Sequence, residues 1–410
     1  MNFIKEELST PIAAKYDVIV VGAGPAGIAA ALSCARGGLN TLIFDRVNCL
    51  GGGWTAGLIN PLFDHQNKSG ILSELISDLD ASGQWGGFFN MSFNYEYMKH
   101  LLDTKMQQAG VDVLLNTFFA KTITENNRVT GVITENIDGR KAYLAKIVFD
   151  CTGDGSVCAD AGCEFQLGSE ENGYKDCQPM TLMFLVGNVP EKYKEGAMLG
   201  DVLKRAYEKA GKDLPYFRPF LIPIPNSKFA VLQFTHMYEY NPLSAKDISA
   251  ATVAGRQQII DAFDALKRFD PDFSELELIT SANVLGVRES RRIVGEYTLT
   301  LEDLVEGRQF EDAVANVTYG IDVHARHGSS RNYQMIRPYQ IPMRSLIPKG
   351  FYGLIVAGRC ISGSMDSMAS YRVTGNCCQM GETAGKVAVA AIKAGIDVRD
   401  VDVKPLFNCN

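Results

Sequence analysis

The chain has 410 residues, of which 46% are hydrophobic and 21% charged, a composition typical of a soluble globular protein with a large core. Its formal net charge of −7 argues against nonspecific binding to nucleic acid. Ten cysteines without a secretory signal at the N-terminus indicate reduced thiols in a cytoplasmic protein, and none has the CxxC spacing with histidines that would predict a metal site.

The first expected element after a short N-terminal arm is a buried strand at residues 18–21, with the sequence VIVV. The motif Gly22-x-Gly24-x-x-Gly27, an alanine-rich helical segment and a second apolar run that ends on Asp45 follow it. Gly22 permits a tight turn, Gly24 lets the backbone approach a pyrophosphate at the helix N-terminus, and Gly27 lets helix and strand pack closely. Asp45 can accept hydrogen bonds from ribose hydroxyls. The segment therefore predicts a site for an ADP-containing dinucleotide.

The same segment does not predict a membrane span. Three glycines and Pro25 interrupt its apolar stretch, and Arg36 follows soon after. A span needs about 20 predominantly apolar residues, which this stretch lacks.

The next elements follow from local patterns. Residues 93–110 predict a helix that ends at Gly110, and residues 111–115 predict a strand. Residues 119–149 predict an antiparallel meander, with turns at Asn126-Asn127 and Asp138-Gly139.

Residues 165–345 differ in composition from the preceding part, because prolines and aromatic residues are more frequent. Strand-like segments alternate there with a helical stretch at 245–268. We expect a substrate domain here, built on a mixed or antiparallel sheet. Near the C-terminus a buried strand at 353–359 and a helix from about 375, closed by Gly395, return to the first pattern. The predicted fold class is α/β, with a discontinuous Rossmann-like domain, containing a parallel sheet and a β-meander, at residues 1–164 and 346–410.

This discontinuity bears on the cofactor. A plain NAD-dependent dehydrogenase usually completes its nucleotide fold in one continuous stretch, whereas a strand and helix that return from the C-terminus favour FAD. A second GxGxxG in a strand–helix context is missing from the sequence, so a built-in NAD(P)H domain is not expected.

Related motifs extend along nearly the whole chain. At these motifs the chain resembles the FAD-dependent oxidoreductases of the glutathione-reductase superfamily, and more closely the bacterial group named simply "FAD-dependent oxidoreductase". The matching segments are DVIVVGAGPAG (17–27), LGGGWTAGLINP (50–61), FDCTGDGSVCADAG (149–162), GVRESRRIVGEYTLTLEDL (286–304), QIPMRSLIP (340–348), LIVAGRCISGSMDSMASYRV (354–373) and CCQMGETAG (377–385).

The resemblance implies noncovalent FAD, with the pyrophosphate at the glycine motif, the adenosine near the end of the second strand, and the flavin near the N-terminus of the last helix. Arg359 departs from the Gly-Asp pair that the wider superfamily places against the ribityl hydroxyls, but it fits the closer group. The FAD-binding residues implied in this way are Gly22, Gly24, Pro25, Ala26, Gly27, Asp45, Arg46, Gly51, Gly52, Phe119, Gly153, Gly358, Arg359, Thr374, Gly375 and Asn376.

Disulfide reductases of this superfamily carry a redox cysteine pair just after their first nucleotide motif. Cys49 stands alone at that place, so disulfide reduction is not expected. The adjacent Cys377 and Cys378 are interpreted as small residues of a packed helix, because neighbouring thiols rarely form a relaxed disulfide.

Histidines are the leading candidates for acid–base chemistry. His324 and His327 precede the return into the FAD-binding domain and form the preferred pair, although both are equally compatible with ordinary loop histidines. His65, after the loop expected beside the flavin, is the alternative base. His236 lies on a strand-like segment and is interpreted as a core or barrel-face residue.

The segment Arg288-Glu289-Ser290-Arg291-Arg292 has two interpretations. One of its arginines, with Arg288 as the candidate, can bind a substrate carboxylate in bidentate fashion. Alternatively, the arginines form internal ion pairs with Glu289 and Glu296. Arg372, just before the last helix, is placed to contact the flavin or the substrate.

The preferred hypothesis is a cytoplasmic flavoenzyme that transfers a hydride between a small polar organic substrate and flavin N5. NAD(P)H or another electron donor or acceptor is expected to bind only transiently, and neither a nucleic acid, a metal nor a membrane is expected as a partner. Two alternatives stay open: a flavin monooxygenase, and a non-redox dinucleotide-binding protein that resembles the thiazole-forming proteins.

Overall fold

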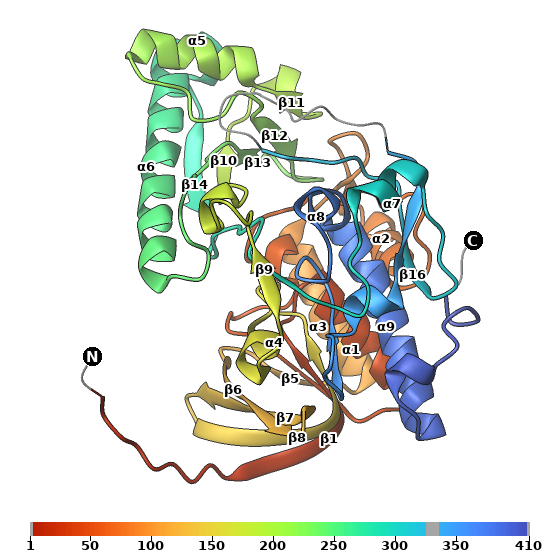
Figure 1. Cartoon of the computed structure of the whole chain (residues 1–410). Coiled ribbons are helices and arrows are strands. Elements are labelled where there is room, and N and C mark those ends of the chain that lie inside the picture. The colour runs from red at the N-terminus through yellow and green to blue at the C-terminus, as the bar shows by residue number, and fades with distance from the viewer. Residues whose placement is uncertain (1–2, 325–335, 408–410) are drawn as a thin grey trace.

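The computed structural model describes residues 3–324 and 336–407, and its largest sheet has seven strands (Figure 1). The strand order is β5-β2-β1-β8-β7-β6, with β18 paired to β8. These strands are β1 (Ile12–Val21), β2 (Thr41–Phe44), β5 (Asp112–Leu114), β6 (Phe118–Glu125), β7 (Arg128–Asn136), β8 (Gly139–Asp150) and β18 (Leu354–Val356).

The long strand β8 joins a parallel and an antiparallel part of this sheet. Its first half pairs in antiparallel fashion with β7, which in turn pairs with β6, so that the three strands form the expected meander. Its second half pairs in parallel with β1 and with β18, where Val148 is opposite Leu354. The strand that returns from the C-terminal region is therefore a member of the first sheet, as the sequence predicted.

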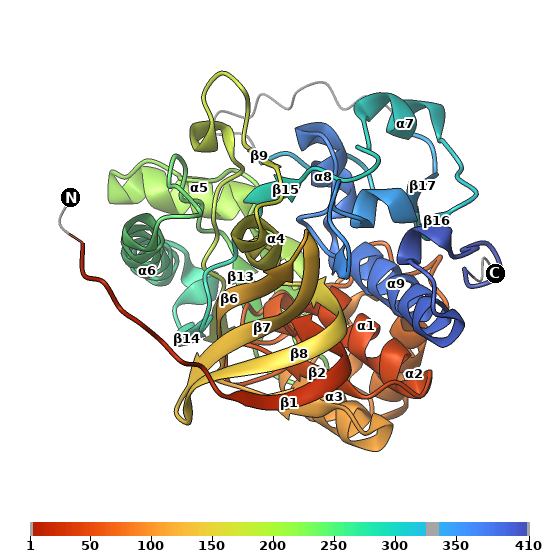
Figure 2. The same cartoon turned by 60° about the horizontal axis from the view of Figure 1, so that its bottom comes forward.

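Two helices on one side of this sheet pack closely on each other: α1 (Pro25–Arg36) and α9 (Thr374–Ala394) (Figure 2). A β-carbon at Gly381 of α9 would lie 2.1 Å from the carbonyl oxygen of Ala26 in α1, so only glycine permits this approach. Helix α3 (Tyr95–Ala109) also contacts α1, and α2 (Ile71–Ala81) contacts α9. Glu382 of α9 accepts a hydrogen bond from the backbone N–H of Ile71 (2.7 Å), at the start of α2.

The second sheet has five strands, all antiparallel, in the order β11-β12-β13-β10-β14. Helices α5 (Gly200–Ala210) and α6 (Ala245–Phe269) pack on each other beside this sheet, as Figure 1 shows. The strands are β10 (Phe184–Gly187), β11 (Ala197–Met198), β12 (Phe220–Pro223), β13 (Ala230–Gln233) and β14 (Glu277–Ser281). The predicted α/β fold class with a separate antiparallel sheet is thus confirmed, while the domain boundaries at 164/165 and 345/346 stay predictions.

Shorter elements lie outside the two sheets. They are the two-stranded pairs β3 (Trp85–Gly86) with β4 (Ser92–Phe93), β9 (Phe165–Leu167) with β15 (Arg291–Ile293), and β16 (Ala313–Val317) with β17 (Tyr339–Pro342), and the helices α4 (Ser156–Ala161), α7 (Leu301–Glu306) and α8 (Met365–Tyr371). In the described ranges, none of the helices is both long and apolar enough to cross a membrane.

Candidate functional site

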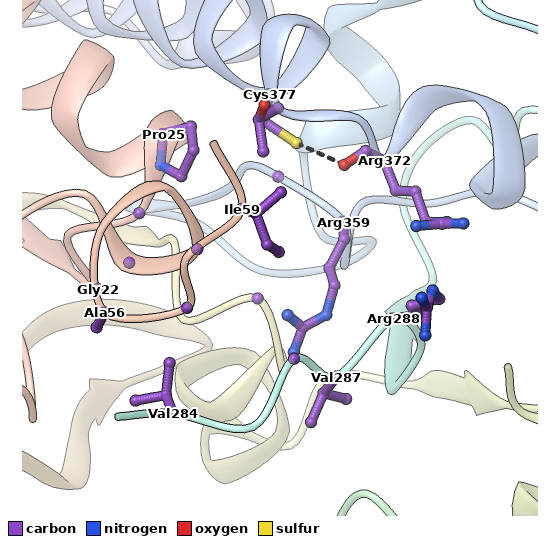
Figure 3. Close-up of a pocket in the computed structure, with 18 of the residues that line it drawn as sticks. Gly22, Pro25, Ala56, Ile59, Val284, Val287, Arg288, Arg359, Arg372 and Cys377 are labelled. Carbon is purple, nitrogen blue, oxygen red and sulfur yellow. Dashed lines mark hydrogen bonds between the residues drawn. The ribbon is translucent and has the colours of Figure 1, made fainter. Parts of the chain in front are cut away.

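One cavity of ≈ 590 Å³ contacts both the large sheet and the five-stranded sheet. The parallel strands β1, β2, β8 and β18 all end at this cavity, because the residues that follow each of them line it: Gly22, Asp45, Cys151 and Ala357. Figure 3 shows Gly22 and Ala56 on one side, Arg288 and Arg372 on the opposite side, and Arg359 between them. Ligands of open α/β sheets bind at the carboxyl ends of the strands, so this cavity is the candidate site.

The three glycines of the motif have different roles. A β-carbon at Gly22 (φ +98°) would lie 2.5 Å from the Cys151 carbonyl oxygen, and one at Gly27 would lie 2.0 Å from the Gly22 carbonyl oxygen. A β-carbon at Gly24 would meet no atom within 4 Å, and Gly24 lines the cavity. Gly22 and Gly27 therefore permit the local fold, whereas Gly24 leaves space in the cavity. Helix α1 begins here without a side-chain cap, so its first N–H groups are available to an anion.

Asp45 stands at the end of β2, where its carboxylate accepts hydrogen bonds from the backbone N–H of Ala23 (2.6 Å) and of Val47 (3.2 Å). It thereby connects the glycine loop with the loop after β2. Asp45, Arg46 and Phe119 all line the cavity, as expected of residues beside an adenosine.

Other residues expected near FAD lie partly on the cavity wall and partly behind it. Pro25, Ala26, Gly52, Gly153, Gly358, Arg359 and Thr374 line the cavity.

Gly51 and Gly375 support the wall from behind. The Gly51 N–H donates to the Ala23 carbonyl (2.8 Å), and a β-carbon at Gly375 would lie 2.6 Å from the Phe63 carbonyl oxygen. Asn376 is fully buried, and neither polar atom of its side-chain amide has a hydrogen-bond partner among the described residues. Helix α9 also begins without a side-chain cap, and its first residue, Thr374, faces the cavity.

An ion pair between Arg359 and Asp154 joins the loops after β18 and β8. Burial disfavours the Asp154 carboxylate, but the neighbouring Arg359 guanidinium outweighs this effect and lowers the pKa of Asp154. A β-carbon at Gly153 (φ +72°) would lie 2.7 Å from Arg359 Nη1. Arg359 therefore packs against a loop that only glycine can form here, and it holds that loop at the cavity wall.

At the end of the cavity opposite the glycine motif, Asp322 contacts Arg372 and His324. Its Oδ2 accepts a hydrogen bond from Arg372 Nη2 (3.0 Å) and lies 3.2 Å from His324 Nε2. Arg372 Nη2 also donates to the Asp322 carbonyl oxygen (2.9 Å). Burial alone would raise the pKa of Asp322, but the adjacent His324 ring and the charges of Arg372 and Arg288 lower it well below its usual range. Asp322 is therefore ionised at neutral pH.

His236 and His324 are in direct contact, with 2.9 Å between His236 Nε2 and His324 Nδ1. His236 Nδ1 lies 2.9 Å from the Phe234 carbonyl oxygen, which can only accept, so this nitrogen carries hydrogen. In a neutral His236 ring Nε2 is then an acceptor, and His324 Nδ1 must donate to it. His324 Nε2 has a hydrogen to donate to Asp322 only when the His324 ring is protonated. One added proton therefore completes this chain of hydrogen bonds.

The surroundings keep both imidazoles neutral. Burial and the charge of Arg288 lower the pKa of His324 to about 4, although the Asp322 carboxylate favours the protonated ring. Burial and the same arginine lower the pKa of His236 well below its usual value. Tyr216 stacks on His236 with 3.7 Å between ring centroids, so the pair is shielded on that side. Geometry favours protonation of His324, whereas burial opposes it, and these are properties of a proton acceptor near neutral pH.

The structure separates the arginines of the segment 288–292. Arg288 faces the cavity, and its Nη1 donates to the Pro179 carbonyl (2.7 Å) and to Thr181 Oγ1 (2.6 Å). Arg292 forms a buried ion pair with Glu289. The ion-pair interpretation therefore applies to Arg292, whereas the carboxylate-binding role of Arg288 stays a prediction. The expected partner Glu296 does not take part, because it pairs with Arg399 (3.3 Å).

The other candidate histidines are not brought to the cavity. His65 Nδ1 donates to the Leu62 carbonyl (2.7 Å), its ring packs edge-on against Trp85, and His65 is not among the residues that line the cavity. The expectation that His65 is the alternative base is therefore not supported by its position. His327 lies outside the described residues.

Sequence reasoning missed His236, Asp322 and Tyr216 as members of the site. His236 was expected to be a core residue, and it is indeed 2% exposed, but it contacts His324. Its position in an apolar segment, just after β13 ends at Gln233, concealed this contact. A signal was available for Asp322, because an aspartate two residues from a candidate histidine is a common orienting partner.

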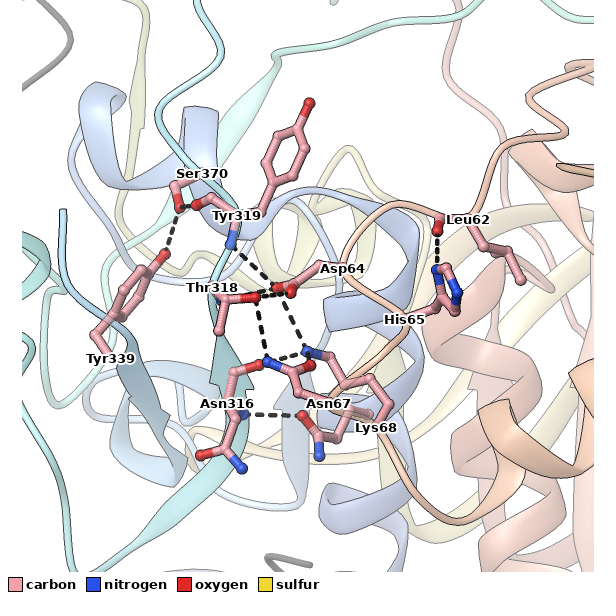
Figure 4. A network of polar contacts seen from close by, with 11 residues as sticks. Leu62, Asp64, His65, Asn67, Lys68, Asn316, Thr318, Tyr319, Tyr339 and Ser370 are labelled. Carbon is pink, nitrogen blue, oxygen red and sulfur yellow. Dashed lines mark hydrogen bonds and ion pairs between the residues drawn. The ribbon is translucent and has the colours of Figure 1, made fainter. Parts of the chain in front are cut away.

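A buried polar network holds the segment that carries Asp322 (Figure 4). Asp64 accepts hydrogen bonds from the Thr318 hydroxyl and from the backbone N–H of Thr318 (3.0 Å) and of Tyr319 (3.3 Å). The Lys68 ammonium lies 3.4 Å from Asp64 and donates to the Asn316 carbonyl (2.6 Å). The network ties the loop before α2 to the chain just ahead of Asp322, and thereby positions the histidine cluster.

These features fit FAD. The uncapped start of α1 and the open space at Gly24 suit a pyrophosphate, and the carboxylate of Asp45 suits a ribose. The uncapped start of α9 suits the electron-rich edge of a flavin, where a helix N-terminus stabilises negative charge. The fold and the site thus define a FAD-binding protein of the Rossmann-like class.

Comparison with known proteins agrees with this assignment. Residues 17–408 match the family described as FAD dependent oxidoreductase, and the chain belongs to this family. It is 39% identical over 121 residues to the thiamine thiazole synthase of Aeropyrum pernix. The aligned residues cover 29% of this chain and 43% of that protein. It is 34% identical over 154 residues to the enzyme of the same name from Methanococcus aeolicus (35% and 57%). The chain thus spans about half the length of these relatives.

Solved structures with the same fold are more distant in sequence. A geranylgeranyl bacteriochlorophyll reductase-like protein from Thermoplasma acidophilum has a TM-score of 0.51 at 16% identity, covering 96% of this chain and 81% of that one. The p-nitrophenol 4-monooxygenase PnpA from Pseudomonas putida has a TM-score of 0.52 at 12% identity, covering 95% and 83%. At these identities the likeness establishes the fold alone.

Proposed function

We propose that this FAD-dependent oxidoreductase transfers a hydride between N5 of noncovalently bound FAD and a small polar organic substrate. The observation that carries the proposal is the continuity of the cavity. One cavity of ≈ 590 Å³ is lined both by the dinucleotide loop and by the titratable cluster of Arg288, Asp322, His324 and Arg372. A substrate at that cluster and a dinucleotide at the loop would share one continuous space.

The protein's own residues would supply orientation and proton transfer. When bound, FAD supplies the hydride acceptor or donor. His324 takes up the proton that a hydroxyl or amino group of the substrate releases on oxidation, and it returns the proton in the reverse direction. His236 accepts the hydrogen bond from protonated His324, and Asp322 accepts the second one. Arg372 holds Asp322 in place through two hydrogen bonds.

The test begins with the visible spectrum of the purified protein, followed by anaerobic mixing with candidate substrates. Loss of the oxidised-flavin absorbance identifies a reducing substrate. The variant His324→Gln should then retain FAD but reduce it about 10²–10⁴-fold more slowly, the usual contribution of a general base. His65→Gln is the matched control and should react like the wild type, because His65 does not line the cavity. Unchanged reduction kinetics in His324→Gln would remove His324 from the mechanism.

A second candidate function comes from the curated relatives. The thiamine thiazole synthase of Aeropyrum pernix is 39% identical to part of this chain, which supports an alternative in which the protein uses its dinucleotide as a ligand rather than as a redox catalyst. A protein that purifies colourless, or whose flavin dithionite cannot reduce, would favour this alternative.

The monooxygenase alternative makes a different prediction. Reduced protein mixed with oxygen would then yield an oxygenated product only when the organic substrate is present. A dehydrogenase would instead give the same oxidised product with any competent electron acceptor.

A further inference from the structure

We propose that the substrate carries a carboxylate, and that Arg288 binds this group at the end of the cavity opposite the glycine motif. The inference rests on the proposed function, because it names the substrate class of the same site. It derives from the hydrogen bonding of Arg288, the charge balance around it, and the neighbouring cavity wall.

The guanidinium of Arg288 is oriented but not neutralised. Its Nη1 donates to the Pro179 carbonyl (2.7 Å) and the Thr181 hydroxyl (2.6 Å), which fix the plane of the group. Both acceptors are uncharged. Among the described residues, none forms an ion pair with Arg288, and none accepts a hydrogen bond from its Nε or Nη2. Two donors on one edge are the arrangement that binds a carboxylate in bidentate fashion.

The charges at this end of the cavity do not balance. Asp322 is the carboxylate beside the two guanidinium groups, and it pairs with Arg372 (3.0 Å). Burial and the charge of Arg372 lower the pKa of Arg288 to about 10, so Arg288 remains a cation at neutral pH. His324 is neutral there, because its pKa is about 4. Arg218 also lines this cavity, but it is exposed, so water screens its charge. Among the other described residues beside Arg288, one positive charge is left without a counter-charge, and such a charge in a partly buried place is costly until an anion binds.

The magnitude of this imbalance favours a carboxylate over a phosphate. A single uncompensated charge matches a monoanion, whereas a phosphate monoester brings about two negative charges at pH 7. FAD does not meet the need, because its pyrophosphate is expected at Gly24, and Figure 3 shows the glycine loop and Arg288 on opposite sides of the cavity. Met183, Phe220 and Ile222 line the same cavity and offer apolar contacts to the body of the ligand.

The test uses the FAD-loaded protein and matched pairs of probes at constant ionic strength. Benzoate and benzamide have the same shape but differ in charge. Binding of either compound beside the flavin is measured by the change in the absorption spectrum of the flavin. We expect benzoate to bind at least 10-fold more tightly than benzamide. In Arg288→Met the affinity for benzoate should fall at least 10-fold, while Arg256→Met, which changes an exposed arginine of α6, should bind benzoate as the wild type does.

Equal affinity for benzoate and benzamide in the wild type would overturn the inference, as would unchanged benzoate affinity in Arg288→Met. Tighter binding of phenyl phosphate than of benzoate would overturn it in favour of a phosphate site. If Arg288→Met loses FAD, Arg288→Lys is used instead, which keeps the charge but loses the two-donor edge, and its affinity for benzoate should still fall several-fold.

The outcome is separable from that of the proposed function. Carboxylates that bind without ever reducing the flavin would support the anion site and contradict hydride transfer. Neutral alcohols that reduce the flavin while benzoate and benzamide bind equally would do the reverse.

Discussion

Replacement of Gly24 by valine separates the fold from cofactor binding. A β-carbon there meets no atom within 4 Å, and the backbone is extended (φ −74°, ψ −178°), a conformation open to valine. The side chain therefore enters the cavity rather than the core. Valine is a poorer N-cap than glycine but restricts the unfolded chain more, so we expect the free energy of unfolding of the FAD-free protein to change by no more than about 1 kcal/mol.

The effect on FAD should be much larger, because the pyrophosphate must approach the backbone at this residue. A 100-fold loss of affinity corresponds to about 2.7 kcal/mol. At a free FAD concentration 100 times the wild-type Kd, bound FAD stabilises the wild type by about 2.7 kcal/mol, but it would stabilise such a variant by only about 0.4 kcal/mol. The stabilisation by FAD should therefore almost vanish.

The assay is thermal or urea unfolding of FAD-free Gly24→Val and wild type, with and without FAD. Gly27→Ala is the contrasting variant, because its β-carbon would lie 2.0 Å from the Gly22 carbonyl oxygen, and it should destabilise the protein even without FAD. A Gly24→Val protein that purifies yellow and binds FAD with wild-type affinity would refute the assignment of this loop.

Three further predictions concern stability. Lys68→Met should lower the free energy of unfolding by about 3–5 kcal/mol, because it leaves the buried Asp64 carboxylate without its cation; a wild-type midpoint in urea unfolding would contradict this. Because the folded pKa of His324 is about 4, below its ordinary 6.5, the folded state binds fewer protons than the unfolded state between these values; stability should fall by up to about 3 kcal/mol as the pH drops from 6.5 to 4, and less in His324→Gln. Gly381→Ala should cost about 1–3 kcal/mol by forcing α9 away from the Ala26 carbonyl, and unchanged thermal stability would contradict this close packing.

Much of the large sheet and its helices could be predicted because their signals are local. Helix α3 ends where Gly110 takes a left-handed conformation (φ 71°), and α9 ends in the same way at Gly395 (φ 68°). The first meander turn has positive φ at both Asn126 and Asn127, which asparagine tolerates better than most residues. Each of these elements is decided by residues a few positions apart, so one sequence is sufficient to recognise it.

The cluster of His236, His324 and Arg288 could be predicted only in part, because its contacts join residues that are far apart in the sequence. His236 and His324 are 88 positions apart, and their contact depends on how β13 and the segment after β16 pack together. The apolar segment around His236 correctly predicts burial but carries no information about the partner of the ring. The direction of Arg288 is likewise decided by Pro179 and Thr181, more than 100 positions earlier in the chain.

The chain path explains why the two kinds of residue nevertheless meet. Strand β8 ends at Asp150, and β18, its parallel neighbour, ends at Val356 opposite Asp150. The chain leaves the sheet at the carboxyl end of β8, on the side where β1 and β2 also end. It reaches the same side again at the carboxyl end of β18. The five-stranded sheet lies within this excursion, between two strand ends that both border the cavity. A sheet inserted at this point of the chain therefore borders the same cavity as the dinucleotide loop. If the proposed function holds, changes within the insertion can alter the substrate without altering Gly22 to Asp45, the segment that we propose binds the cofactor.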